Sequence, residues 1–277
     1  MAFKLACCMV QYTLADVPFA TALKSMQRLG FTGVETHVPS EVLAEGRTRL
    51  REHLDAHKLQ PVKLVTGGGG IKGLGDLAEQ DKAKLRESLK EFRRHVLLAH
   101  DNGFPTILVF TGPRPQRMTE EASFELAAQS LASIADYARD HDVRLTIEAH
   151  PGGLVNDLTS FLKLRDLSHS KNVFANVDPS NYWVAGDDAL TVLKRLGRLV
   201  GGIHVKDVVK AGDRNCWALP GRGSVDWPAF LTALKSSGYD KTIGWLDIEY
   251  EEGVTGRAER DPETGSKESR DYIQSLL

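Results

Sequence analysis

The sequence predicts an α/β protein, a single (β/α)8 barrel of the TIM type formed by residues 1–277. Short apolar runs alternate with longer segments whose apolar residues recur every three to four positions, the pattern of helices with one buried face. Eight such repeats favour a closed barrel over an open doubly wound sheet. The length of 277 residues is close to the roughly 250 residues that one barrel needs.

The predicted strands are almost continuously apolar, which is typical of a parallel sheet covered by helices. They comprise residues 5–10, 33–37, 61–65, 106–110, 144–148, 173–177, 202–205 and 243–249. The helices predicted between them include residues 19–29, 40–57, 81–102, 119–141 and 227–237. Gly30, Gly103 and Gly238 follow three of these helices, and glycine at this position commonly ends a helix.

Two further segments call for an interpretation. Residues 251–268 are polar and charged, and we predict a loop over the carboxyl-terminal face of the barrel, followed by a short last helix at 267–277. The four glycines at 67–70 follow the third strand; they are either a phosphate cradle made by backbone amides or, more commonly, a flexible turn. The first strand lacks a G-x-G-x-x-G turn, so a dinucleotide-binding fold receives no support.

Charge and cysteine content limit the possible partners and compartments. Lysine plus arginine number 35 and aspartate plus glutamate 37, so the basic excess of a dedicated nucleic-acid binder is missing. The apolar run near the amino terminus is too short for a membrane span. Cys7, Cys8 and Cys216 form no disulfide framework, and adjacent cysteines in a strand point to opposite faces. We expect a reduced, cytoplasmic protein without nucleic-acid or membrane partners.

Four polar residues end four consecutive predicted strands, where active sites of such barrels lie. They are Glu148, Asp178, His204 and Glu249. Three carboxylates at one barrel mouth would repel one another unless a cation lay among them. Carboxylate oxygens with one imidazole nitrogen suit Mn²⁺, Mg²⁺, Co²⁺ or a mixed-ligand Zn²⁺ site.

Each of these residues has a commoner role when it occurs alone. A strand-end glutamate is usually a cap or an ion-pair partner, and a histidine on an apolar strand is usually a hydrogen-bonded core residue. The occurrence of all four at consecutive strand ends favours the metal site, because perturbed carboxylates cluster at functional sites.

An ordered set of short motifs resembles the xylose-isomerase-like barrel superfamily over nearly the whole chain. The motifs are LGFTGVE at 29–35, IEAHPG at 147–152, VDPS at 177–180, HVKD at 204–207, PGRGSVDW at 220–227 and IE at 248–249. This superfamily includes sugar phosphate isomerases and epimerases, ketose 3-epimerases, inosose dehydratase, hydroxypyruvate isomerase and endonuclease IV.

The resemblance implies that Glu148, Asp178, His204 and Glu249 hold one divalent metal ion, with no organic cofactor. It also implies that Glu148 and Glu249 are catalytic and move protons on opposite faces of the substrate. The implied activity is isomerisation or epimerisation of a small keto sugar or sugar acid through an enediolate. The alternative is a lyase, a dehydratase or decarboxylating enzyme, that uses the same metal site. Barrels of this family often self-associate, so a homo-oligomer is also expected.

Two departures from the family pattern concern the substrate. Asn181 stands where many epimerases and endonuclease IV have histidine, and the third and fourth strands end without the histidines of a trinuclear zinc site. A DNA-repair activity is therefore disfavoured. Arg222 replaces a glutamate that is common in relatives, which indicates either an acidic substrate or a solvated loop arginine.

The expected substrate-binding residues are His37, His150, Asn181, Lys206 and Arg222. His150 and Lys206 lie two positions after Glu148 and His204, so their side chains should point to the same side of the sheet. Lys206 would polarise a substrate oxygen, or alternatively form an ion pair with a neighbouring carboxylate. His37 and Glu35 lie at the end of the second strand. A third hypothesis, a non-catalytic sugar-binding barrel, is disfavoured by the intact set of ligands.

Overall fold

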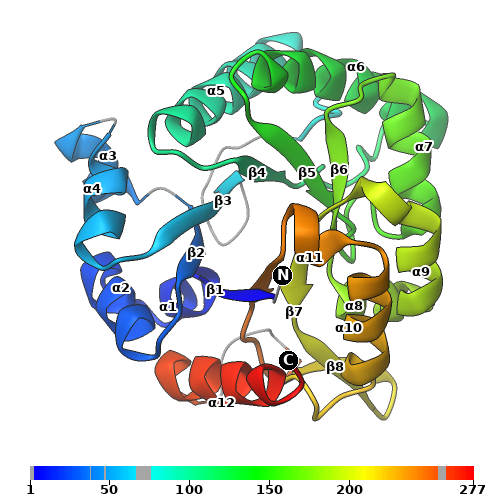
Figure 1. The fold of residues 1–277 in the computed structure, drawn as a ribbon. Helices are drawn as coiled ribbons and strands as arrows, with labels where there is room; N and C mark the ends of the chain where they lie inside the picture. The colour runs from blue at the N-terminus through cyan, green and yellow to red at the C-terminus, as the bar shows by residue number, and fades with distance from the viewer. Residues whose placement is uncertain (1–2, 38, 47, 67–75, 255–259) are drawn as a thin grey trace.

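In the computed structural model, the residues described are 3–37, 39–46, 48–66, 76–254 and 260–277. Eight parallel strands close into a barrel in the order β1-β10-β7-β6-β5-β4-β3-β2. The helices form a ring around this barrel (Figure 1). The predicted fold class is confirmed.

The barrel strands coincide with the predicted apolar runs to within two residues at each end. They are β1 Lys4–Cys8, β2 Gly33–Thr36, β3 Gln60–Thr66, β4 Thr106–Val109, β5 Arg144–Glu148, β6 Val173–Val177, β7 Val200–Val205 and β10 Trp245–Ile248. β1 closes the ring by pairing with both β10 and β2, and the register shifts at one point in each of the pairs β2–β3 and β6–β7.

The barrel interior is arranged in layers along the strands. Trp245 packs with Ala6 and Val62 near the amino-terminal end. Two residues further along β10, Asp247 is fully buried and contacts the ammonium group of Lys63. Because side chains two apart on a strand share a face, an apolar layer is followed by a charged layer. The carboxyl-terminal mouth lies directly beyond that charged layer.

The outer helices follow the predicted amphipathic segments, with two corrections. They are α1 Val10–Leu14, α2 Phe19–Arg28, α3 Ser40–Glu45, α4 Arg49–Ala56, α5 Lys82–Asp101, α6 Glu120–Arg139, α7 Leu158–Ser168, α8 Pro179–Ala185, α9 Ala189–Leu196, α10 Trp227–Ser236, α11 Tyr239–Thr242 and α12 Pro262–Ser275. The helix predicted at 40–57 is two helices, because Gly46 adopts a φ of 137° between them. The last helix begins at Pro262 rather than at 267, with Asp261 as its amino-terminal cap.

A hairpin outside the barrel was not predicted. Strands β8 Asp207–Ala211 and β9 Arg214–Ala218 pair antiparallel. Gly212, with a φ of 60°, lies in the turn between them. Trp217 of β9 forms a bridge with Gly253, which ties the hairpin to the segment that follows β10.

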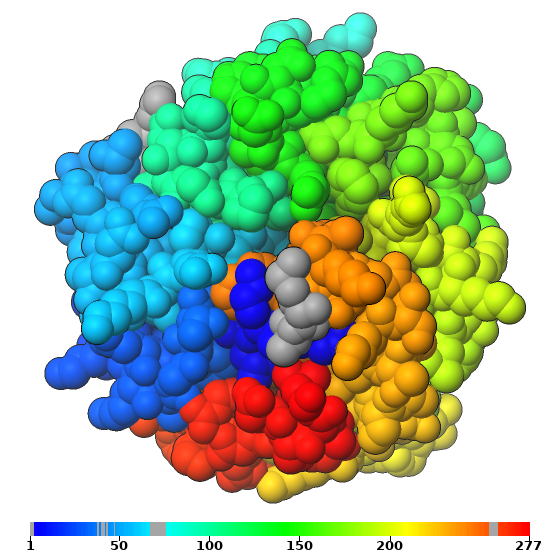
Figure 2. All heavy atoms as spheres, in the orientation of Figure 1, coloured from blue at the N-terminus to red at the C-terminus, as the bar shows by residue number. Residues whose placement is uncertain are grey.

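The face of the molecule turned to the viewer in Figure 2 is the one at which β1 begins. The beginning of β1 and the segment around α11 lie at the centre of this face, and α12 borders them. Cys7 and Cys8 of β1 are buried free thiols, and Cys216 is also free. Among the helices formed by the described residues, none has both the length and the apolar character of a membrane span.

Candidate metal centre and substrate pocket

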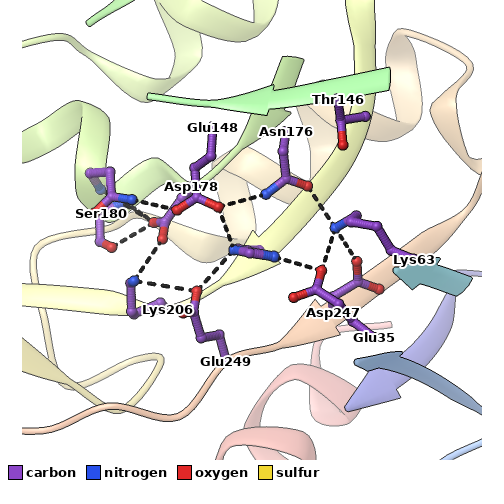
Figure 3. Close-up of polar contacts among 12 residues, drawn as sticks. Glu35, Lys63, Thr146, Glu148, Asn176, Asp178, Ser180, Lys206, Asp247 and Glu249 are labelled. Carbon is purple, nitrogen blue, oxygen red and sulfur yellow. Dashed lines mark hydrogen bonds and ion pairs between the residues drawn. The ribbon is translucent and has the colours of Figure 1, made fainter. Parts of the chain in front are cut away.

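The structure brings the four predicted ligands together at the carboxyl-terminal mouth of the barrel. Glu148 ends β5, Asp178 directly follows β6, His204 lies in β7 and Glu249 directly follows β10. One donor atom from each residue lies within 4.8 Å of the others. Figure 3 shows the carboxylates of Glu148, Asp178 and Glu249 pointing toward a common centre. All four side chains are almost entirely removed from solvent.

The imidazole of His204 is held between carboxylates on both of its nitrogens. Nδ1 lies 3.0 Å from Oε2 of Glu148 and 2.9 Å from Oε2 of Glu249. On the other side of the ring, Nε2 lies 2.8 Å from Oε2 of Glu35. A carboxylate on the outer nitrogen is the arrangement that orients a metal-binding histidine. Glu35 therefore directs Nδ1 toward the centre.

Asp178 is oriented by the start of helix α8. Its Oδ1 accepts hydrogen bonds from the backbone N–H groups of Ser180 and Asn181, at 2.8 and 3.2 Å, and from the Ser180 hydroxyl at 2.5 Å. Pro179 occupies the first turn, where its missing N–H costs nothing. Because Oδ1 caps the helix, Oδ2 is left to face the centre, 3.0 Å from Nζ of Lys206.

Glu148 is held by two side-chain amides. Asn181 donates to Oε1 at 2.7 Å, and Asn176 donates to Oε2 at 3.1 Å. Asn181 is fully buried and does not line the pocket described below. The structure thus places this predicted substrate-binding residue behind Glu148, where it orients the carboxylate.

The donor atoms at the centre fit a divalent cation. Asp178 Oδ2, His204 Nδ1 and Glu249 Oε2 are buried, and within the described part of the chain their close contacts are ion pairs with Lys206, with Glu148 and with one another rather than regular hydrogen bonds. Buried polar atoms are normally satisfied by hydrogen bonds. Three carboxylates and one imidazole nitrogen form a donor set suited to Mn²⁺, Mg²⁺, Co²⁺ or Zn²⁺.

The electrostatics of the centre also favour a cation. Burial alone would lower the pKa of His204, but the charges of Glu35, Glu148 and Glu249 raise it well above its usual value. Burial would raise the pKa of Glu249, yet Lys206 and His204 hold it below its usual range. The same carboxylates would stabilise a metal ion bound at Nδ1 of His204, since a proton and a metal compete for that lone pair.

Lys206 and Glu251 extend the charged cluster beyond the four candidate ligands. Nζ of Lys206 lies 3.3 Å from Oε2 of Glu249 and 3.2 Å from Oε2 of Glu251. It also lies 4.8 Å from the ring centroid of Trp217 in the β8–β9 hairpin. Burial raises the pKa of Glu251 to about 7. Glu251 was not predicted, because it lies in the polar segment after β10 rather than at a strand end.

A cavity of about 420 Å³ opens onto the centre, and this volume suits a small-molecule ligand. Its polar lining includes Glu35, His37, Glu148, His150, His204, Lys206, Glu249 and Glu251. Its apolar lining includes Met9, Val10, Val65, Leu108, Phe110, Pro113 and Val155. Nε2 of His37 lies 3.3 Å from Oγ1 of Thr13, and the ring of His150 stands edge-on to Phe110. Three of the predicted substrate-binding residues, His37, His150 and Lys206, therefore line this pocket.

Arg222 is not brought into the pocket. Its side chain is 58% exposed and pairs with Glu268 of α12 at 2.8 Å. The carboxylate of Glu268 lies beside this loop and pairs with the guanidinium. The prediction that Arg222 binds substrate is therefore not supported by its position, which matches the solvated alternative. The glycines at 67–70 lie outside the described residues.

Fold and site together define a (β/α)8 barrel with a cluster of candidate metal ligands at its carboxyl-terminal mouth. A family model for the xylose isomerase-like TIM barrel matches residues 23–276. The chain therefore belongs to this family, and the resemblance seen in the sequence motifs is confirmed.

A curated relative and two solved structures resemble this chain over nearly its whole length. An inosose dehydratase of Mesomycoplasma hyopneumoniae (strain 7448) is 23% identical, over 95% of this chain and 90% of the relative. The crystal structure of an IolI protein with a bound zinc atom superposes with a TM-score of 0.79 at 18% identity, over 99% of both chains. An L-ribulose 3-epimerase superposes with the same TM-score and identity, over 100% of this chain and 95% of the epimerase. The names of two of these relatives, a dehydratase and an epimerase, are names of enzymes.

Proposed function

We propose that this protein is a divalent-metal-dependent isomerase or epimerase of a small keto sugar or sugar acid, acting through an enediolate. The observation that carries the proposal is the convergence of buried donor atoms from Asp178, His204 and Glu249 on one centre beside the pocket, which His204 and Glu249 line. Glu148 completes the set. The likeness to an epimerase and to a zinc-containing neighbour supports the same assignment.

The chemistry divides between the metal and the side chains. A divalent cation at the centre would polarise a substrate carbonyl and stabilise the negative charge that enolisation creates. Glu148 and Glu249 both line the pocket, and in Figure 3 they reach the centre from opposite sides. One carboxylate can therefore accept the proton next to the carbonyl, and the other can return a proton to the opposite face.

The remaining lining residues would bind and orient the substrate. Lys206 has its ammonium group beside Asp178, Glu249 and Glu251, within reach of a substrate oxygen at the centre. His37 and His150 offer imidazole nitrogens to outer hydroxyl groups. The apolar wall formed by Val65, Leu108 and neighbouring side chains excludes water and strengthens the electrostatic interactions of the reacting groups.

A lyase is the second candidate function, and two observations favour it. A relative that matches over nearly its whole length is named as an inosose dehydratase. In addition, Glu251 lines the pocket 3.2 Å from Lys206 and does not belong to the four-residue ligand cluster. A carboxyl group so placed would protonate a departing β-hydroxyl group, a step that elimination requires and epimerisation does not.

Proton exchange from solvent tests the shared step and separates the two candidates. Metal-loaded protein is incubated in D₂O with keto sugars, inososes and keto sugar acids, and the products are followed by NMR and mass spectrometry. We expect deuterium to enter next to the carbonyl of at least one compound, because both reactions begin by removing that proton. An isomer or epimer keeps the substrate's atoms apart from deuterium, whereas a dehydratase product has lost water. Chelator-treated protein is the control, and the absence of exchange across the panel would contradict the proposal.

A further inference from the structure

We propose that Lys63, buried in the middle of the barrel, is a positioning residue that sets the orientation of two metal ligands, His204 and Glu148. This inference rests on the proposed metal site. It adds a residue that touches neither the metal nor the substrate pocket and that nonetheless determines metal affinity.

The ammonium group of Lys63 has three N–H donors, and three side chains supply an acceptor for each. It donates to Oε2 of Glu35 at 2.7 Å, to Oδ1 of Asn176 at 2.7 Å and to Oδ2 of Asp247 at 2.6 Å. The side chain is fully buried. Every donor is therefore used, and the acceptors come from three other strands or strand ends, which Figure 3 shows grouped around the lysine.

The first connection runs through Glu35 to His204. The same Oε2 of Glu35 that accepts from Lys63 lies 2.8 Å from Nε2 of His204. This contact places the ring proton on Nε2 and leaves the lone pair of Nδ1 directed at the centre. Lys63 holds the Glu35 carboxylate in the position that makes this contact.

The second connection runs through Asn176 to Glu148. An amide side chain has a donor end and an acceptor end, and the wrong orientation would turn its oxygen toward a carboxylate. Lys63 binds Oδ1, so Nδ2 is the end that faces Oε2 of Glu148 at 3.1 Å. Lys63 thereby selects the orientation in which the amide supports the ligand.

Strand β7, on the opposite side of the barrel, has a glycine where Lys63 needs space. Gly202 of β7 lies next to its stem, and a Cβ at this position would lie 3.0 Å from Cε of Lys63 and would collide with the amide of Asn176. Glycine at 202 therefore keeps both the lysine and the asparagine in their contacts.

Asp247 provides a matched control for the charge of Lys63. Within the described residues it forms a side-chain hydrogen bond only with Lys63 and none with a candidate ligand. The double variant Lys63→Met/Asp247→Asn removes one positive and one negative charge together, so the buried charge balance is kept. Asp247→Asn alone perturbs the same layer but leaves both connections to the ligands in place.

Titration with Co²⁺, followed by its visible absorption bands, tests the inference. Such bands report coordination geometry, which a purely structural role of Lys63 would leave unchanged. We expect the double variant to bind Co²⁺ about 10- to 100-fold more weakly than wild type, with an altered spectrum. Asp247→Asn should resemble wild type in both affinity and spectrum.

Glu35→Gln keeps Lys63 and interrupts only the path to His204, so it gives a second test if the double variant does not fold. It should also weaken Co²⁺ binding and change the spectrum. Wild-type affinity and spectrum in the folded double variant, or in Glu35→Gln when the double variant is unfolded, would overturn the role of Lys63 while leaving the metal site standing. A wild-type protein that binds no Co²⁺ would instead remove the metal site itself.

Discussion

Glu249→Gln should lower kcat by roughly 10²- to 10⁴-fold, the contribution typical of a positioned acid or base. Glutamine has the same shape but cannot take up a proton. In the structure the Glu249 carboxylate lines the pocket 2.9 Å from His204 and is held in its charged, basic form by Lys206 and His204, which lower its pKa despite burial. Steady-state kinetics on the substrate found by the deuterium screen would measure the loss.

The matched control is Glu268→Gln, the same chemical change outside the pocket. Glu268 pairs with Arg222 and Arg260. We expect this variant to keep the wild-type kcat, since neither of its partners lines the pocket. A folded Glu249→Gln variant with near-normal turnover would refute the catalytic role of Glu249.

Lys63→Met should destabilise the protein by about 3–5 kcal/mol, the cost typical of removing one partner from a buried ion pair. The substitution leaves the carboxylates of Glu35 and Asp247, which lie 2.7 and 2.6 Å from the ammonium group, without their counter-charge in the barrel interior. The free energy of unfolding is measured by urea denaturation of chelator-treated protein, so that metal binding does not contribute.

A double-mutant cycle separates the charge effect from the loss of packing. Asp247→Asn added to Lys63→Met removes one of the uncompensated carboxylates, so part of the lost stability should return. If the single and double variants were equally unstable, the loss would come from packing rather than from charge. A Lys63→Met variant as stable as wild type would contradict the buried ion-pair network.

Local sequence patterns were sufficient to predict the barrel and the four candidate ligands. Short apolar runs that alternate with amphipathic helices are typical of parallel strands covered by helices. In a barrel of such strands, the polar residues that end the runs lie together at the carboxyl-terminal mouth. Glu148 and Asp178 illustrate this: each stands at the end of its run, and the structure places both at one centre. Their position required no knowledge of which strands are neighbours.

Features that depend on contacts across the barrel were missed. Lys63 lies inside an apolar run. It is two residues before Val65 on the same strand, so the two side chains share a face. Its partners Glu35, Asn176 and Asp247, however, become identifiable only once the barrel closes. A cation at the centre of a buried strand was the available signal, since such a charge requires partners.

Two errors concern segments outside the barrel strands. The Gly212-Asp213 pair between two short β-prone runs is typical of a hairpin turn and could have predicted β8 and β9. The position of Arg222 could not be predicted, because it depends on the packing of α12, which carries Glu268, beside the loop of Arg222.

The metal content of the wild-type protein, purified without chelator or nickel affinity resin, tests the central claim most directly. Glu148→Ala, purified in the same way, provides the comparison, because it removes one of the four converging donors. The metal site predicts about one equivalent of Mn, Mg, Co or Zn in the wild type and its loss in the variant. A metal-free wild type whose thermal stability does not respond to any of these ions would contradict it, and the four residues would then be an ion-paired polar cluster.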